Sequence, residues 1–115
     1  VSSASIMGVV GSTPAKNASY TAAKGGLVNL TREVALQWAR KGVRVNAICP
    51  GWFATEMTEG LTSTDRGRAF IDDTTPMNRI GGVHELDGAL LLLASDAGSY
   101  MTGSIVMVDG GWTAR

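Results

Sequence analysis

The chain has 115 residues, which is enough for one domain and no more. Hydrophobic residues make up 44% and charged residues 17%, a globular composition that excludes disordered and fibrous classes. Ten basic residues balance ten acidic ones and no apolar run is long enough for a membrane span, so we expect neither nucleic-acid nor membrane binding. A single cysteine excludes an internal disulfide and favours a reducing, cytoplasmic environment.

The first ten residues are interpreted as the end of a strand and its loop, starting in mid-element. An amphipathic helix is predicted from Ser19 to about Lys41. Its apolar positions are Leu27, Leu30, Val34 and Trp38. Gly25 and Gly26 lower the helix propensity of this segment, so we expect close packing at both positions.

A buried strand is predicted at residues 43–49, ending at Pro50-Gly51. Residues 52–80 are polar and irregular, with one short helix expected around 64–71. A second helix is predicted for 83–95 and a last strand for 103–108. This order predicts an α/β fold in which three parallel strands form one flank of a doubly wound sheet.

Tyr20 and Lys24 lie four residues apart at the start of the long helix, so they share one helix face. An ammonium beside a phenol stabilises the phenolate, which suits proton transfer near neutral pH. The alternative is an ordinary surface pair of an aromatic residue and a lysine.

Further polar candidates follow the predicted strands. Ser5 ends the first strand and could donate a hydrogen bond to a substrate carbonyl. Pro50-Gly51 ends the next strand, where ligands bind in open α/β sheets, and the Thr55 hydroxyl follows. The alternatives are a capping serine, a turn dipeptide and a loop threonine.

Three segments carry a family resemblance. They are Ser5 with Tyr20-Thr-Ala-Ala-Lys24-Gly25-Gly26, then Arg44-Val45-Asn46-Ala47-Ile48-Cys49-Pro50-Gly51, then Val108-Asp109-Gly110-Gly111. In this order they resemble the C-terminal half of the short-chain dehydrogenase/reductase family, in particular members such as gluconate 5-dehydrogenases and 3-oxoacyl-carrier-protein reductases. The resemblance implies the C-terminal portion of one NAD(P)-binding Rossmann-type domain, a three-layer doubly wound sheet, over residues 1–115.

The resemblance also implies roles for single residues. Tyr20 of the YxxxK motif would be the general acid or base, assisted by Lys24 and Ser5, in hydride transfer between NAD or NADP and a carbonyl or secondary alcohol. Residues 56–80 would form a substrate lid, with Met57 or Phe53 lining the pocket. The cofactor-binding residues would be Tyr20, Lys24, Pro50, Gly51, Trp52, Phe53 and Thr55. The implied partners are a small-molecule substrate and the other copies of a homodimer or homotetramer.

The sequence departs from the family pattern in two respects. Ser5 and Tyr20 are two residues further apart than is common, which places a longer loop at 12–16 and keeps Ser3 as a second candidate for the catalytic serine. The family's glycine-rich loop, Asn-Ala-Gly segment and catalytic asparagine are missing, so we expect these residues to be inactive by themselves.

The other chemistry-bearing residues have simpler interpretations. Cys49 is expected in the core and His84 at a solvated helix start, and one histidine with one cysteine makes a metal site improbable. A second hypothesis is a non-catalytic half-Rossmann module for binding or assembly. The mixed lid does not choose between sugar acids, acyl thioesters and other alcohols as substrates, nor does the chain choose between NAD and NADP.

Overall fold

A computed structural model describes residues 1–11 and 16–114, so most of the predicted longer loop at 12–16 lies outside the described residues. Three strands, β1 (Ser2–Ser3), β2 (Ala47–Pro50) and β3 (Ile105–Val108), form a parallel sheet in the order β1-β2-β3. The three predicted parallel strands are therefore confirmed. The strands β2 and β3 are shorter than the predicted ranges 43–49 and 103–108.

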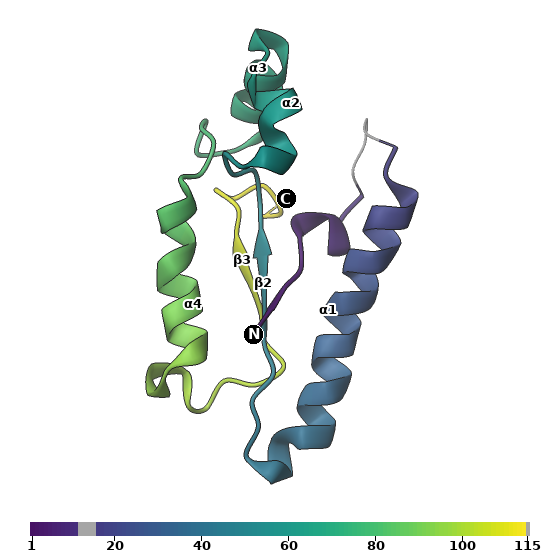
Figure 1. Cartoon of the computed structure of the whole chain (residues 1–115), viewed down its shortest axis with the longest axis vertical. Helices are drawn as coiled ribbons and strands as arrows, with labels where there is room; N and C mark the ends of the chain where they lie inside the picture. Colours follow the sequence, from purple (N-terminus) through teal and green to yellow (C-terminus); the bar gives the residue numbers. More distant parts are fainter. Residues whose placement is uncertain (12–15, 115) are drawn as a thin grey trace.

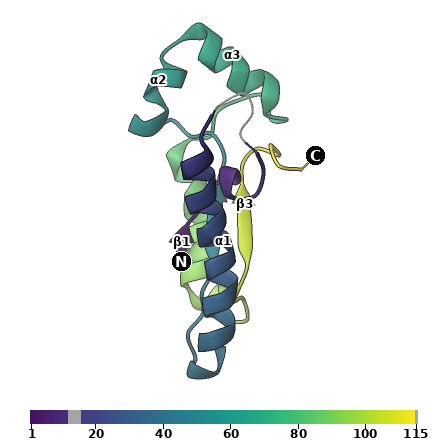
Figure 2. The same cartoon turned by 90° about the vertical axis from the view of Figure 1, so that its right-hand side faces the viewer.

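The helices α1 (Ala18–Trp38) and α4 (Asp87–Ala94) lie on opposite faces of this sheet (Figures 1 and 2). Two further helices, α2 (Glu59–Thr62) and α3 (Asp65–Thr74), lie beyond the carboxyl ends of the strands. Five 3₁₀ turns complete the secondary structure that the described residues show: η1 (Ile6–Gly8), η2 (Ala39–Lys41), η3 (Glu56–Thr58), η4 (Val83–Leu86) and η5 (Asp96–Gly98). The arrangement is the expected helix–sheet–helix layering of an α/β fold.

The helix α1 begins and ends close to its predicted limits, but a different face is buried. Its buried residues are Val28, Thr31 and Ala35, whereas Leu30 and Trp38 are 54% and 43% exposed. The centre of the buried face is therefore shifted by about one residue from the predicted stripe. Of the other two predicted apolar positions, Leu27 packs against the core and Val34 is half-buried. Small and medium side chains at the contact let α1 lie close to the sheet, and larger ones would hold it away.

The close approach between α1 and the N-terminal segment occurs at Gly8. A Cβ atom there would lie 2.6 Å from the Lys24 carbonyl oxygen, so only glycine lets η1 pack against this turn of α1. A Cβ at Gly25 would make an ordinary contact of 3.6 Å, and one at Gly26 would meet nothing within 4 Å among the described residues. The expectation of tight packing at those two glycines is therefore not met in this structure.

The core between α1 and the sheet is formed by Ala4, Val28, Ala47 and Cys49. Asn46, which is 1% exposed, connects β2 to the segment before β3. Its side chain donates a hydrogen bond of 2.9 Å to the Met101 carbonyl and accepts one of 3.0 Å from the Ser104 N–H. These bonds hold β2 and β3 in register.

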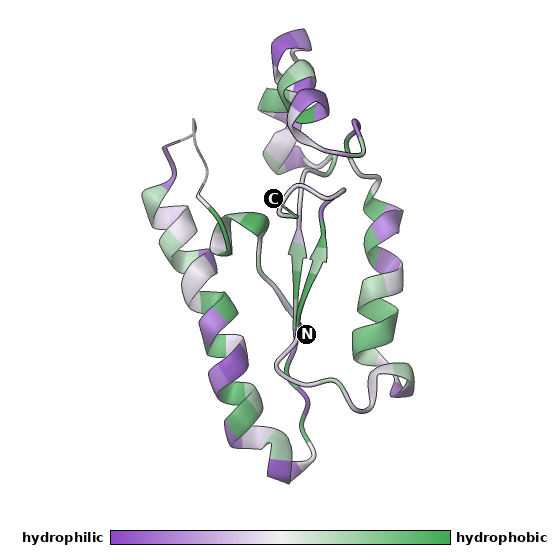
Figure 3. Cartoon of the chain, turned by 180° about the vertical axis from the view of Figure 1, so that it is seen from behind, coloured by the Kyte–Doolittle hydropathy of each residue, from purple (hydrophilic) through white to green (hydrophobic). Residues whose placement is uncertain are grey.

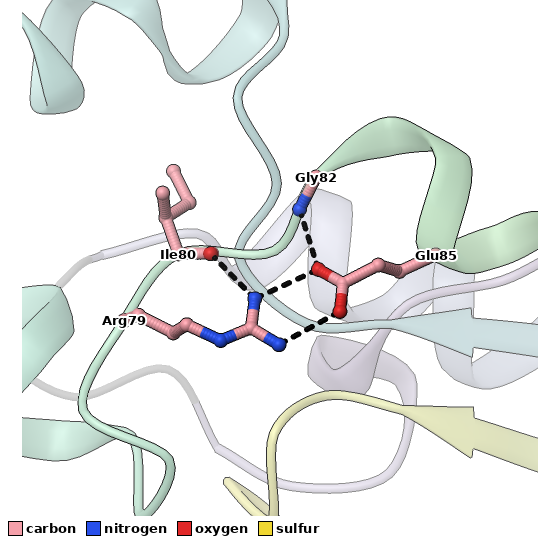
Figure 4. A network of polar contacts seen from close by, with 4 residues as sticks. All are labelled: Arg79, Ile80, Gly82 and Glu85. Carbon is pink, nitrogen blue, oxygen red and sulfur yellow. Dashed lines mark hydrogen bonds and ion pairs between the residues drawn. The ribbon is translucent and has the colours of Figure 1, made fainter.

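An ion pair joins the end of segment 56–80 to the start of the second helical region (Figure 4). The Arg79 guanidinium donates two hydrogen bonds of 2.7 Å to the Glu85 carboxylate, which also accepts one of 2.8 Å from the Gly82 N–H. Glu85 thereby caps η4 and fixes the chain where it enters this turn. The pair lowers the pKa of Glu85 to about 2.

Hydrophobic residues occur along both α1 and α4 (Figure 3), and several of them are exposed. In α4 these are Leu90, Leu91 and Leu92, and in α1 Leu36 is 78% exposed. A helix that is apolar on more than one side is normally covered on more than one side. Within the described part of the chain, no helix is both long and apolar enough to cross a membrane.

Candidate active site

An open cavity of about 730 Å³ lies where β1 and β2 end, between the start of α1 and the α2–α3 segment. Ligand sites in proteins commonly have volumes of this order. Its lining includes Ser5, Tyr20, Gly51, Trp52, Phe70 and Trp112. One wall is an apolar cluster of Ile6, Met7 and Trp112, against which Tyr20 and Trp52 pack.

Ser5 is held in place by the turn that follows β1. It is the N-cap of η1, and its Oγ accepts a hydrogen bond of 3.2 Å from the Met7 N–H. Because Oγ is the acceptor in this bond, the hydroxyl proton is available to a ligand in the cavity. Ser3 is exposed and does not line the cavity, so the geometry favours Ser5 over Ser3 as the serine that contacts a ligand.

Tyr20 and Lys24 lie one helical turn apart near the N-terminus of α1. The Lys24 Nζ atom is 5.7 Å from the centroid of the Tyr20 ring and donates a hydrogen bond of 2.9 Å to the Ser3 carbonyl. The predicted shared face is therefore present. Tyr20 lines the cavity, and the Lys24 side chain connects α1 to the end of β1.

The six residues from Pro50 to Thr55 divide between the cavity and its surroundings. Gly51 and Trp52 line the cavity with Tyr20. Phe53 is buried under Gly81 and lines a smaller hollow of about 170 Å³, while Thr55 is exposed at the start of η3. Of the two residues suggested for the pocket wall, Met57 lines the main cavity and Phe53 does not.

Gly51 also permits a contact on the side of β3. A Cβ atom at Gly51 would lie 2.7 Å from the Asp109 Cα. Burial would raise the pKa of the Asp109 carboxyl, but hydrogen bonds from Thr113 and Gly111 outweigh it and lower that pKa. These bonds order the turn that carries Trp112 into the cavity wall.

Arg66 and Trp112 are two of the cavity residues that sequence reasoning did not single out as site candidates. Arg66 lies in segment 56–80, which was expected as a lid without a role for this side chain. Arg66 and Phe70 are four residues apart in the predicted helix, and this spacing was a usable signal of a shared face. Trp112 follows a glycine pair, which does not predict a direction for its side chain.

Neither Cys49 nor His84 lines the cavity. Cys49 is fully buried in the core, as predicted, and burial raises the pKa of its thiol. His84 is exposed in η4. Among the described residues, no group of three or more histidine, cysteine, aspartate or glutamate side chains could hold a metal ion.

Sequence comparisons relate this chain to known dehydrogenases and reductases. A family model described as enoyl-(acyl carrier protein) reductase matches residues 1–113. The galactitol 2-dehydrogenase (L-tagatose-forming) of Cereibacter sphaeroides is 48% identical over 111 residues, which are 95% of this chain and 43% of that protein. The gluconate 5-dehydrogenase of Gluconobacter oxydans is 46% identical over 96 residues, 84% of this chain and 38% of its own. The chain thus spans about two fifths of the length of these curated relatives.

Solved structures are similar to this one over nearly the whole length of the chain. A putative 2-deoxy-D-gluconate 3-dehydrogenase from Agrobacterium tumefaciens with bound NADP has a TM-score of 0.92 and 41% identity, covering 98% of this chain and 45% of that one. A 4-hydroxyisoleucine dehydrogenase complexed with NADH has a TM-score of 0.93 and 32% identity, covering 98% and 46%. The parallel sheet with helices on both faces is of the Rossmann type. The chain belongs to the short-chain dehydrogenase/reductase family.

Proposed function

We propose that these residues form the catalytic part of an NAD(P)-dependent oxidoreductase that interconverts a secondary alcohol and a carbonyl compound. The observation that carries the proposal is the convergence of Ser5 and Tyr20 on one cavity, with Lys24 beside Tyr20. Three elements, the end of β1, η1 and α1, bring these side chains together. A module kept only for binding or assembly has no need of this arrangement.

In the proposed reduction, the Tyr20 phenol donates a proton to the substrate oxygen, and in oxidation the phenolate takes it back. The Ser5 hydroxyl donates a hydrogen bond to the same oxygen, since its Oγ already accepts from Met7. Lys24 holds its positive charge next to the Tyr20 ring and stabilises the phenolate.

The cavity suits the nicotinamide half of NAD or NADP. When bound, the nicotinamide supplies or accepts the hydride at the substrate carbon. Gly51 and Trp52 form a wall at the carboxyl end of β2, and the buried Trp52 Nε1 has no acceptor among the described residues, so it can serve a ligand. Of the other cofactor candidates, Tyr20 lines the cavity and Lys24 lies beside Tyr20, whereas Pro50, Phe53 and Thr55 would need to act from outside the lining seen here.

Since the chain spans about two fifths of its curated relatives, we propose that it acts within a longer protein and that segment 56–80 is its substrate lid. The lid carries Met57 and Phe70 over the cavity. The exposed leucines of α1 and α4 would be covered in the complete protein, including contacts between copies in a homodimer or homotetramer.

The proposal is tested by giving the full-length protein NADH or NADPH and a panel of small ketones. We expect the reduced cofactor to be consumed with at least one ketone, which is measured as a loss of NADH or NADPH absorbance. Binding of the cofactor without turnover of any ketone or of the corresponding alcohols would instead support the non-catalytic module.

A further inference from the structure

We propose that the substrate of this cavity carries an anionic group, a carboxylate, and that Arg66 binds it. The inference rests on the proposed oxidoreductase function and names the substrate class for the same site. Among the described residues that line the cavity, Arg66 alone has a charged side chain, and neither aspartate nor glutamate lines it. A guanidinium stays protonated at all physiological pH values, so the wall has a net positive charge.

The charge of Arg66 is not neutralised within the described part of the chain. Its acidic neighbour Asp65 forms an ion pair with Arg68. Arg66 itself makes neither a hydrogen bond nor an ion pair with any described residue, so its donors are available to a ligand. A planar guanidinium is well matched to a carboxylate, which can accept two parallel hydrogen bonds from it.

The start of α3 is fixed in a way that directs Arg66 and Phe70 to the cavity. The Thr64 side chain caps the helix by accepting a hydrogen bond of 3.0 Å from the Gly67 N–H. A Cβ at Gly67 would overlap the Leu61 carbonyl oxygen, so glycine lets this turn lie directly on α2. Arg66 and Phe70, four residues apart, then both line the cavity.

The remaining polar groups of the wall also favour an acceptor-rich ligand. Trp52 offers a buried Nε1–H without an acceptor among the described residues, and Ser5 offers its hydroxyl proton. Of the substrate classes that the sequence left open, sugar acids bring a carboxylate, whereas acyl thioesters are uncharged at the reacting group and simple alcohols are neutral. The geometry therefore favours a hydroxy or keto acid.

The test compares two ligands that differ only in this charge. They are 5-dehydro-D-gluconate and L-sorbose, in which a CH₂OH group replaces the carboxylate. The full-length protein is studied as wild type, Arg66→Gln and Arg66→Lys, with Arg68→Gln as a matched control on the same helix. The readouts are kcat and KM for both ligands, KM for the cofactor, and ligand binding followed by tryptophan fluorescence, because Trp52 and Trp112 line the cavity.

We expect Arg66→Gln to raise KM for the keto acid about 10- to 100-fold and to change KM for L-sorbose by less than about threefold. The KM of Arg66→Lys for the keto acid should lie between those of wild type and Arg66→Gln, and that of Arg68→Gln should equal the wild-type value. An equal loss for both ligands, or a loss of cofactor affinity in place of keto-acid affinity, would overturn the proposal. If the wild-type protein reduced 5-dehydro-D-gluconate and L-sorbose equally well, the anion site would be rejected, whereas the proposed oxidoreductase function would be supported. Conversely, Arg66-dependent binding of the keto acid without turnover would support the anion site and reject the proposed function.

Discussion

The Nζ atom of Lys24 lies 5.7 Å from the centroid of the Tyr20 ring, one turn of α1 away, and donates a hydrogen bond to the Ser3 carbonyl. This places a positive charge next to the phenol and ties the helix to the end of β1. The position of Tyr20 relative to Ser5 therefore depends on Lys24 as well as on the helix backbone. The proposed chemistry depends on this connection.

Replacing Lys24 by methionine removes the charge and the bond to Ser3 while keeping a long side chain. We expect kcat of the full-length protein to fall about 10- to 100-fold, the range for loss of one charged hydrogen bond. The exposed Lys41→Met is the matched control and should leave kcat unchanged. Equal activities of the two variants in a steady-state assay would contradict the role of Lys24.

The two serine candidates can be separated by alanine substitution. Ser5→Ala removes a hydroxyl that lines the cavity and is expected to lower kcat about 100-fold, the lower range for one lost oxyanion donor. It also removes the N-cap of η1, which costs about 1 kcal/mol of unfolding free energy. Ser3→Ala, at an exposed position, should retain activity. The reverse result would make Ser3 the catalytic serine.

The fold could be predicted from the sequence where local patterns decide it. The long helix, the strand ending at Pro50-Gly51 and the parallel arrangement follow from periodicity and chain order, and the structure confirms them. The buried face of α1 could not be predicted, because Leu30 and Trp38 are apolar but point away from this sheet. Periodicity locates apolar stripes without saying which surface covers them.

The candidate site could likewise be predicted only in part. Ser5, Tyr20 and Lys24 could be singled out because their spacing has a chemical meaning, and the structure places them together. The contributions of Arg66 and Trp112 depend on how the α2–α3 segment and the C-terminal turn lie over the strand ends. Those placements rest on contacts between residues far apart in the sequence, such as the Cβ-excluding approach of Gly51 to Asp109.

Gly8 provides a test of the packing that brings η1 to α1. A methyl group at this position would lie 2.6 Å from the Lys24 carbonyl oxygen, so Gly8→Ala must displace the backbone. We expect a loss of about 1–3 kcal/mol in unfolding free energy, as for other overpacked sites, together with lower activity. Gly60→Ala in α2 meets nothing within 4 Å in the described structure and serves as the control. Denaturant unfolding that shows equal stability for both variants would contradict this packing.

The Arg79–Glu85 pair predicts a specific dependence of stability on pH. The hydrogen bonds from Arg79, and then from Gly82, lower the pKa of Glu85 from 4.5 to about 2 in the folded protein. The stabilisation is therefore fully present above pH 4.5 and is lost as the pH falls towards 2. Wild type should be more thermostable than Glu85→Gln at pH 7, and the difference in Tm should shrink below pH 4.5. A Tm difference that does not change with pH would contradict the assignment.

The most direct test of the proposed catalytic role compares two tyrosine variants of the full-length protein. Tyr20→Phe removes only the hydroxyl proposed to transfer the proton, and Tyr100→Phe makes the same change at a fully exposed tyrosine. We expect kcat to fall at least about 100-fold for Tyr20→Phe with cofactor affinity retained, and to stay at the wild-type value for Tyr100→Phe. Wild-type turnover by Tyr20→Phe would show that another group carries the proton.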